Sequence, residues 1–193
     1  HLAVLSEDSR GRLAEASALT EALRLYDSPY HAELDWWTGP FATDDGIPPH
    51  SSLVSAAESD RVDVGRAFPV THHGQRRAQV TEDRSKILVL SALGDTRRDV
   101  LACGGEALSA TLLEATMAGL STCPLTHLTE VPRRPRDVGA LTGHPLPQVL
   151  IRVGWSRHWT TCHRPPPAPV EQRAVVAAIG RRDLAVEAAH GPS

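Results

Sequence analysis

A short apolar run followed directly by a capped helix is the feature of this sequence that most constrains its fold. Residues 87–90 (Ile-Leu-Val-Leu) are all apolar, which is typical of a strand buried on both faces. Thr96 and Asp99 then have the spacing of a capping box, which predicts the start of a helix, and Gly119 is well placed to end it. The sequence therefore predicts a strand–helix unit over residues 87–119.

One face of this predicted helix is apolar, and we expect that face to be buried. The apolar residues on it are Leu101, Leu108, Leu112 and Met117. The helix also carries residues small enough to let another backbone approach closely: Gly104, Gly105, Ala107, Ser109 and Ala110.

The flanking segments extend the pattern. Residues 11–37 predict two helices, and Ser28 is expected to be the N-cap of the second, with Pro29 at its first helical position. Residues 131–143 predict a further helix and residues 148–153 a second strand. The resulting order is β-α-(β)-α-β, in which the middle strand is optional, and it indicates the α+β class. The first helix is expected to bury a stripe made of Leu13, Ala16, Leu19 and Leu23.

Residues 38–85 form a long stretch rich in Gly, Pro, Asp, Ser and His, with a helical period only near residues 52–59. A connection of this length inside a compact domain is uncommon, and it is often a lid or a binding loop. Two interpretations stay open with equal weight: a cover over a site, or an excursion without function.

Charge and cysteine content exclude several classes of protein. The 193 residues carry a formal net charge of −3, which argues against a dedicated binder of nucleic acid or of anionic membranes. No apolar stretch is long enough to cross a bilayer. The three cysteines form no CxxC pair, which favours a reducing compartment, here the cytoplasm. Because the chain opens at His1 and its one methionine is Met117, we expect a piece of a longer protein.

The usual catalytic and metal-binding motifs do not occur. There is no GxSxG, P-loop, HExxH or GxGxxG pattern, and His158, Cys162 and His163 lack a fourth partner at zinc-site spacing. We therefore expect no metal site. Cys103 and Cys123 are expected to be small buried hydrophobic residues.

What remains is the block from Cys103 to Pro132, in which a glycine-terminated helix leads into a predicted tight Thr-Cys-Pro turn. Such a turn can present main-chain N–H and C=O groups to the rim of a flat heterocycle, as proteins do at the edge of a flavin. The alternative is an ordinary helix-to-strand connection, which the pattern alone favours.

Four blocks of this sequence, in order, resemble the Acg-type branch of the nitroreductase-like flavoproteins: residues 31–39 (HAELDWWTG), 45–61, 83–91 and 103–123. Within the last block, residues 112–123 (LLEATMAGLSTC) resemble the family's helix that precedes a turn on the flavin. The resemblance covers about residues 20–154. It implies a truncated, FMN-dependent three-layer α/β/α half-domain, with residues 1–154 as the C-terminal half of a fused duplication. The branch belongs to a dormancy regulon, which implies a role in stress response.

The resemblance also implies a cofactor and a site. Thr122, Cys123, Pro124, Leu125 and Thr126 match the stretch that contacts FMN, and no side chain need act as a catalytic residue because the flavin does the chemistry. The implied partners are a nicotinamide nucleotide, a small-molecule electron acceptor and a homologous half. The family's arginine- and serine-containing phosphate motif has no match here, nor does its closing C-terminal segment.

Residues 155–193 differ in character from the rest, and we expect a poorly ordered tail. Back-translation of residues 154–168 in a shifted frame gives LVAALDDVPPPTP, which resembles the acidic, proline-rich ending of the family. The hypothesis is that this tail is encoded out of frame.

The function that the resemblance implies is that of a partial FMN-dependent NAD(P)H oxidoreductase, which moves a hydride from nicotinamide to flavin and electrons on to an acceptor. Two alternatives stay open. One is a non-catalytic flavin-binding or flavin-storage protein, in which residues 38–85 exclude nicotinamide. The other is an inactive, truncated pseudo-enzyme without a cofactor.

Overall fold

The computed structural model describes residues 1–38, 56–68, 83–130 and 134–155. These residues fall into two compact units. The first comprises His1–Gly11 and the chain from Arg84 onward, and the second comprises Arg12–Asp83. Each unit is described by itself.

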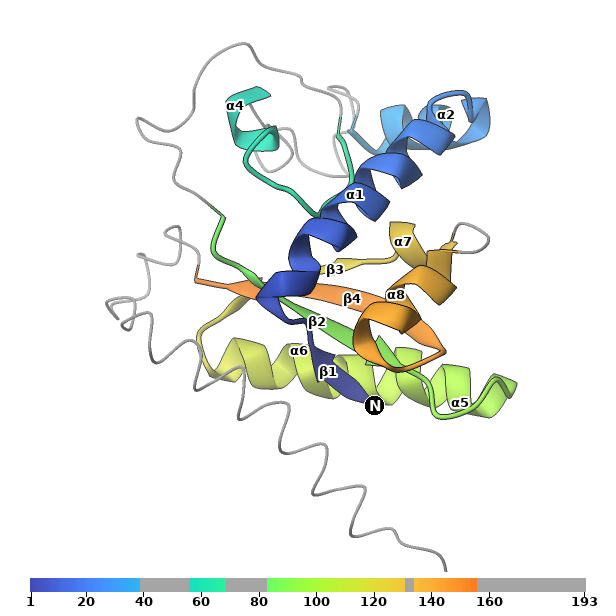
Figure 1. Cartoon of the computed structure of the whole chain (residues 1–193), viewed down its shortest axis with the longest axis vertical. Coiled ribbons are helices and arrows are strands. Elements are labelled where there is room, and N and C mark those ends of the chain that lie inside the picture. Colours follow the sequence, from blue (N-terminus) through green and yellow to red (C-terminus); the bar gives the residue numbers. More distant parts are fainter. Residues whose placement is uncertain (39–55, 69–82, 131–133, 156–193) are drawn as a thin grey trace, which may run out of the picture. The chain divides into compact units, whose positions relative to one another are not determined.

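A four-stranded antiparallel sheet is the centre of the first unit (Figure 1). Its strands are β1 (Leu2–Val4), β2 (Lys86–Ser91), β3 (Ser121–Leu125) and β4 (Pro147–Gly154), in the spatial order β1-β2-β4-β3. With the helices that surround it, this sheet confirms the α+β class. The sequence analysis did not predict strand β1. Strand β3 corresponds to the optional strand of the predicted order.

Strands β2 and β4 lie in the middle of the sheet and are apolar on both faces. Leu88 pairs with Ile151 and Leu90 with Val149 on one face, whereas Val89 pairs with Leu150 on the other. Residues 87–90 are almost entirely inaccessible to solvent, as predicted for a strand buried on both sides. The central pair therefore needs a covering layer on each face.

A composite helix covers the first face. It consists of α5 (Arg97–Leu101), the π-helical segment η1 (Ala102–Ala107) and α6 (Leu108–Met117). Thr96 caps its start as predicted, because the Thr96 hydroxyl accepts a hydrogen bond of 3.2 Å from the Asp99 N–H. The single regular helix that was predicted is wrong in the middle, where η1 contains Gly104 and Gly105, the residues that most readily accept an altered backbone.

The buried face of the composite helix is lined by small residues. Cys103, Thr111 and Ala115 are buried and Ala107 is half-buried, at steps of four residues. Of the predicted apolar face, Leu108 and Leu112 pack against the core, but Leu101 is 61% and Met117 80% exposed. The prediction is wrong for these two because the wider π turn changes the phase of the helix and because small residues allow close contact with the sheet.

Two short helices lie on the opposite side of the sheet from α6 (Figure 1). They are α7 (His127–Glu130), which was not predicted, and α8 (Arg134–Thr142), which falls within the predicted 131–143. The Thr129 hydroxyl donates a hydrogen bond of 2.9 Å to the main-chain carbonyl of Gln148 and so ties α7 to β4. Gly143, at φ +76°, follows the end of α8 as predicted.

In the second unit, α1 (Glu7–Arg24, whose first turn belongs to the first unit) is followed by α2 (Ser28–Thr38) and α4 (Ala56–Ser59). The two predicted helices are confirmed, but Asp27 rather than Ser28 caps α2, since the Asp27 carboxylate accepts from the Tyr30 N–H at 3.1 Å. Residues 39–55 and 69–82 lie outside the described residues, so the lid interpretation of 38–85 stays a hypothesis.

The predicted apolar stripe of α1 is largely wrong. Leu13 is buried, but Leu19 and Leu23 are exposed, and Ser17 and Thr20 are buried in their place. Both polar side chains have hydrogen-bond partners: the Ser17 hydroxyl donates to the Gly65 carbonyl at 3.2 Å and the Thr20 hydroxyl to the Ala16 carbonyl at 2.8 Å. Burial of a hydroxyl costs little when it is bonded in this way.

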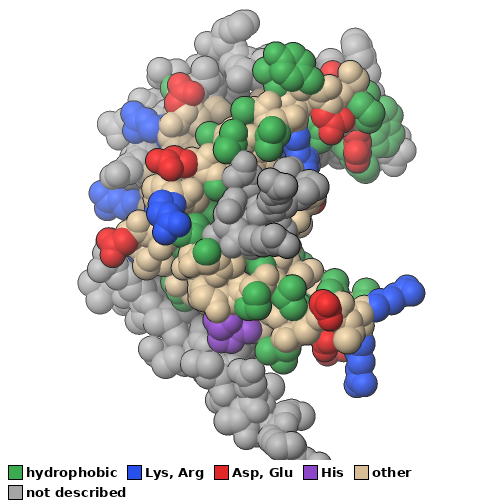
Figure 2. All heavy atoms as spheres, turned by 45° about the vertical axis from the view of Figure 1, so that its right-hand side comes forward, with side chains coloured by type: hydrophobic (Ala, Val, Ile, Leu, Met, Phe, Trp, Pro, Cys, Tyr) green, Lys and Arg blue, Asp and Glu red, His purple; other side chains and the backbone are tan. Residues whose placement is uncertain are grey.

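Among the described helices, none has the length and apolar character needed to span a bilayer. Acidic and basic side chains are interspersed over the visible face of the described residues (Figure 2).

Gly119 ends α6 and turns the chain into β3. The Leu120 N–H bonds to the Ala115 carbonyl and the Gly119 N–H to the Thr116 carbonyl, both at 2.9 Å, which is the Schellman pattern. Gly119 has φ +73°, and a Cβ atom there would lie 3.3 Å from Cζ3 of Trp155. Gly143 has a similar φ of +76°, but a Cβ atom there would meet nothing within 4 Å.

We therefore expect Gly119→Ala to lower the free energy of unfolding more than Gly143→Ala. The Gly143→Ala change should cost about 1 kcal/mol from left-handed backbone strain alone. The Gly119→Ala change should cost about 2 kcal/mol, because the methyl group also crowds the Trp155 ring. Urea unfolding followed by circular dichroism measures both values, and equal losses for the two variants would contradict the role given to Trp155.

Candidate functional site

The segment predicted to contact the flavin is an edge strand. Ser121–Leu125 forms β3, paired with β4 in the register Thr122↔Val153, Cys123↔Arg152 and Pro124↔Ile151. The prediction of a tight Thr-Cys-Pro turn is therefore wrong. The reversal of direction is completed earlier, at Gly119, and the hydrogen bonds of the segment come from β4.

The predicted site residues are not buried beneath other elements. Thr122 is half-buried, Cys123, Pro124 and Thr126 are exposed, and only Leu125 is buried. The expectation that Cys123 is a buried hydrophobic residue is wrong, because it lies on a strand at the edge of the sheet. For Cys103, which is buried, that expectation is confirmed.

Because β3 is the last strand of the described sheet, it has a ladder partner on one side only. Half of its main-chain N–H and C=O groups therefore point away from the sheet. A proline in a strand is tolerated where its nitrogen faces outward, so Pro124 indicates the outward parity. The N–H and C=O groups of successive residues in a strand point to opposite sides, so those of Thr122 point the same way as those of Pro124. The free edge therefore consists of the Thr122 N–H and C=O and the Pro124 C=O.

Thr126 has a different place from the other four predicted residues. It precedes α7, and its carbonyl accepts from the N–H groups of Thr129 (2.8 Å) and Glu130 (3.1 Å). Its hydroxyl also donates to the Glu130 carboxylate. The structure thus brings Thr122 to Leu125 together on one edge, whereas the polar groups of Thr126 serve the start of α7.

A corner that the sequence analysis missed adjoins the beginning of β3. The Oγ of Ser121 and the Nε1 of Trp155 are buried and have no hydrogen-bond partner in the described part of the chain. Ser121 pairs with Gly154, and Trp155 packs under Gly119 and against the core. Unbonded buried polar atoms are uncommon in folded proteins. The sequence analysis ended the folded unit at residue 154 and therefore missed this corner, because Trp155 is part of the packing.

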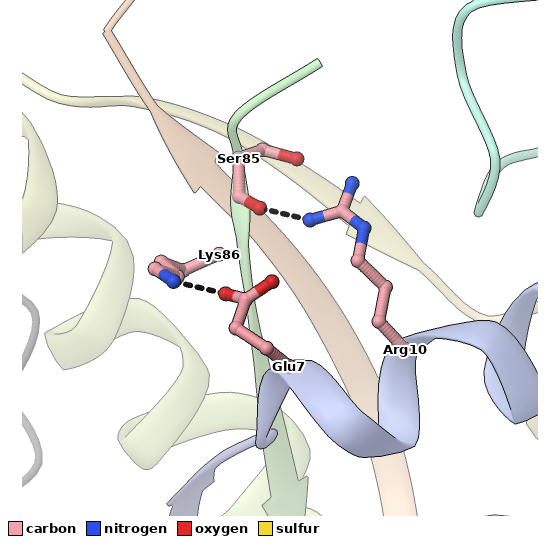
Figure 3. A network of polar contacts seen from close by, with 4 residues as sticks. All are labelled: Glu7, Arg10, Ser85 and Lys86. Carbon is pink, nitrogen blue, oxygen red and sulfur yellow. Dashed lines mark hydrogen bonds and ion pairs between the residues drawn. The ribbon is translucent and has the colours of Figure 1, made fainter. Parts of the chain in front are cut away.

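A positive charge lies beside β3 and is held by a hydrogen bond to Ser85. Arg152 is the register partner of Cys123, which places the two side chains on one face of the sheet, and its Nε donates to the Ser85 hydroxyl at 3.3 Å. The Ser85 carbonyl accepts from Arg10 (Figure 3). Residues at the start of β2 thus connect β4 with the first turn of α1.

Lys86 forms the second link in the same network. It makes an ion pair with Glu7, one helical turn before Arg10 (Figure 3). Because Glu7 is largely exposed, this pair contributes little stability by itself. Its consequence is positional, since it fixes the first turn of α1 beside the beginning of β2.

The main chain of this edge offers groups for recognition of a ligand. The outward N–H of Thr122 can donate, and the outward carbonyls of Thr122 and Pro124 can accept. That set matches the rim of an isoalloxazine ring, which offers acceptors at N5 and O4 and a donor at N3. The described residues contain no group of His, Cys, Asp and Glu side chains that could hold a metal ion.

Comparisons with known proteins identify relatives of this chain. No protein-family model matches it. It is 58% identical over 166 residues to "Putative NAD(P)H nitroreductase acg" of Mycobacterium tuberculosis (strain ATCC 25618 / H37Rv), which covers 86% of this chain and 49% of that protein. The chain belongs to the Acg-type family of nitroreductase-like proteins.

Two further relatives come from the same strain. The uncharacterized protein Rv3127 is 54% identical over 155 residues, which cover 79% of this chain and 44% of that protein. "Putative NAD(P)H nitroreductase Rv3131" is 32% identical over 133 residues, which cover 67% of this chain and 38% of that protein. This Acg-type chain therefore spans about half the length of the curated relatives it matches, or less.

The two described cysteines of this Acg-type chain should differ sharply in reactivity. Cys123 is exposed on β3, whereas Cys103 is buried against the sheet, and burial raises the pKa of the Cys103 thiol. Burial limits the access of reagents to Cys103, and the raised pKa lowers the fraction of its thiol that is ionised. Both effects make Cys103 less reactive. In the folded protein, iodoacetamide should alkylate Cys123 at least about tenfold faster than Cys103, and the rate at Cys103 should rise with pH because only the thiolate reacts.

Peptide mapping by mass spectrometry measures each site separately, and alkylation in denaturant supplies the control in which the two rates converge. Equal rates in the folded protein would contradict the placement of β3 at the exposed edge.

Proposed function

We propose that this chain is part of an FMN-dependent NAD(P)H oxidoreductase of the nitroreductase type, with the free edge of β3 at the flavin rim. The feature that carries the proposal is the edge position of β3, on which the proline at position 124 and the alternation of the strand imply an outward-facing main chain at Thr122 and Pro124. Family membership supports it, since relatives bear the name NAD(P)H nitroreductase. Cytoplasmic location is part of the proposal.

When bound, the flavin would accept a hydride from the nicotinamide nucleotide and pass electrons on to a small-molecule acceptor. The residues of this chain bind and orient. The Thr122 N–H would donate to the ring's acceptor edge, and the carbonyls of Thr122 and Pro124 would accept from its ring N–H. Arg152 contributes positive charge beside the strand, and positive charge near a flavin tunes its electronics.

The phosphate of FMN needs partners that this edge does not supply. Charge-assisted bonds from Arg and Ser are the ordinary way of holding a phosphate, and the described part of β3 offers no cationic side chain of its own. We therefore include a homologous half in the proposal, which would complete the phosphate site. The greater length of the relatives supports this step, because each is about twice as long as its matched portion or longer.

A second candidate is a truncated pseudo-enzyme that binds no flavin. The half-length match to the relatives and the unmatched phosphate motif favour it. The storage alternative predicts bound flavin that nicotinamide does not reduce. All three functions can be separated in one set of measurements.

The test begins with FMN added to the purified chain while flavin fluorescence is followed. The oxidoreductase proposal predicts quenching, and then rapid loss of flavin absorbance when NADPH is mixed in by stopped flow. Quenching followed by reduction with dithionite but not with NADPH would support storage. Fluorescence that stays unchanged at concentrations of FMN up to about 1 mM, where even weak binding is detectable, would support the pseudo-enzyme.

Proline substitutions test which backbone groups contact the flavin. Thr122→Pro removes an outward N–H and should weaken FMN binding about tenfold, the effect of one lost hydrogen bond, with little loss of stability. Cys123→Pro removes an inward N–H from the ladder with β4 and should instead lower the melting temperature. Thr122→Ala and Cys123→Ala keep the main chain and are the matched controls. If the alanine variants bound FMN more weakly and the proline variants did not, recognition by the main chain would be contradicted.

A further inference from the structure

Two arginine side chains from different elements meet at the serine that precedes β2. Arg152, on β4, donates through its Nε to the Ser85 hydroxyl at 3.3 Å. Arg10, in the first turn of α1, donates to the Ser85 carbonyl (Figure 3). All three residues are half-buried. Because partial burial lowers the local dielectric constant, the repulsion between the two guanidinium groups is stronger than in water, and so is their attraction for an anion.

The network around Ser85 carries more positive than negative charge. Its cations are Arg10, Lys86 and Arg152, and its carboxylate is Glu7, which forms an ion pair with Lys86 (Figure 3). A guanidinium group has five N–H donors, so a bond to Ser85 leaves it able to bind further groups at the same time. The two arginines can therefore hold an anion without releasing the serine that positions them.

A serine hydroxyl on β3 faces the same side of the sheet as Arg152. Cys123 is the register partner of Arg152, and Ser121 lies two residues before Cys123, so all three side chains share one face. The Oγ of Ser121 is buried and has no hydrogen-bond partner among the described residues. Its own register partner is Gly154, which has no side chain to fill the space beside it. An unbonded buried hydroxyl is costly, so Ser121 indicates a polar partner from outside the described chain.

We propose that Arg10, Arg152 and the Ser121 hydroxyl bind an oxyanion of the phosphate type, with Ser85 holding the two arginines together. Guanidinium groups bind phosphate oxygens through charge-assisted hydrogen bonds, and a serine hydroxyl can donate to a further oxygen. The ligand is free phosphate or the phosphate group of a nucleotide. No atom of the free edge of β3 takes part, so this proposal and the flavin proposal can fail separately.

Cys123 supplies a probe within the protein. It is exposed, and as the register partner of Arg152 it has its Cβ atom about 5 Å from that of the arginine. Iodoacetate and iodoacetamide react with the same thiolate, but only iodoacetate carries a negative charge. The ratio of their rate constants at Cys123 therefore reports the local positive charge, because the thiolate fraction cancels.

The first experiment alkylates the whole chain at low ionic strength and measures Cys123 by peptide mapping. The ratio of iodoacetate to iodoacetamide rates should exceed that of 2-mercaptoethanol about fivefold. Arg10→Gln and Arg152→Gln should each lower it about twofold to threefold, since each removes one charge. Arg98→Gln removes an exposed arginine on α5 and is the matched control, which should leave the ratio unchanged. Circular dichroism shows whether each variant keeps the fold.

The second experiment adds inorganic phosphate. At about 1–10 mM, phosphate should lower the ratio more than sodium chloride of the same ionic strength, because a bound oxyanion neutralises the arginines. Ser121→Ala should raise the phosphate concentration required about fivefold, the effect of one lost hydrogen bond, and leave the ratio without phosphate unchanged.

Nucleotides distinguish the sources of the oxyanion. A lower ratio with FMN but not with riboflavin assigns the phosphate to the flavin nucleotide. A lower ratio with NADPH but not with reduced nicotinamide riboside assigns it to the nicotinamide nucleotide. An effect of inorganic phosphate alone assigns the site to free phosphate.

Three results would overturn the proposal. One is a ratio at Cys123 equal to that of 2-mercaptoethanol, or one that Arg10→Gln and Arg152→Gln leave unchanged. Another is an effect of phosphate no larger than that of sodium chloride, which would indicate screening without binding. The third is an equal fall in Arg98→Gln, because the charge sensed by Cys123 would then not belong to this site.

Discussion

The pairing of β2 with β4 is the interaction on which the rest of the first unit depends. Both strands are apolar on both faces, so each face must be covered to remove it from water. The composite helix meets this requirement on one side, and α7 and α8 lie on the other. Strand β3 joins the sheet only through β4. The main-chain groups proposed to meet the flavin are therefore positioned by the pairing of β3 with β4.

Recognition by the main chain of an edge strand, as proposed for this chain, would have a chemical consequence. Thr122 and Pro124 would act through main-chain groups, which every residue has except that proline lacks the N–H donor. Their side chains could therefore change without loss of the site. The exposed edge would be protected from pairing with other strands in part by Pro124, which cannot donate to a ladder. Function and solubility would then rest on the same residue.

Features with a local cause could be predicted from the sequence, whereas those set by distant partners could not. The cap at Thr96, the end of α6 at Gly119 and the burial of residues 87–90 follow from neighbours within a few positions. Strand β3 contains a proline and takes its hydrogen bonds from β4, about thirty residues later, which no local pattern shows. The burial of Ser17 likewise depends on the carbonyl of Gly65, far along the chain. The free edge at Thr122 could be recognised only once the order of strands was known.

The π-helical segment Ala102–Ala107 sets the angular offset between α5 and α6. A π turn is wider than an α turn and winds through fewer degrees per residue, so it holds one residue more for nearly the same total rotation. Loss of one glycine from this segment would therefore restore regular winding while α5 and α6 kept the same faces toward the sheet. A single-codon deletion could thus remove the irregular turn and leave both ends of the helix in place.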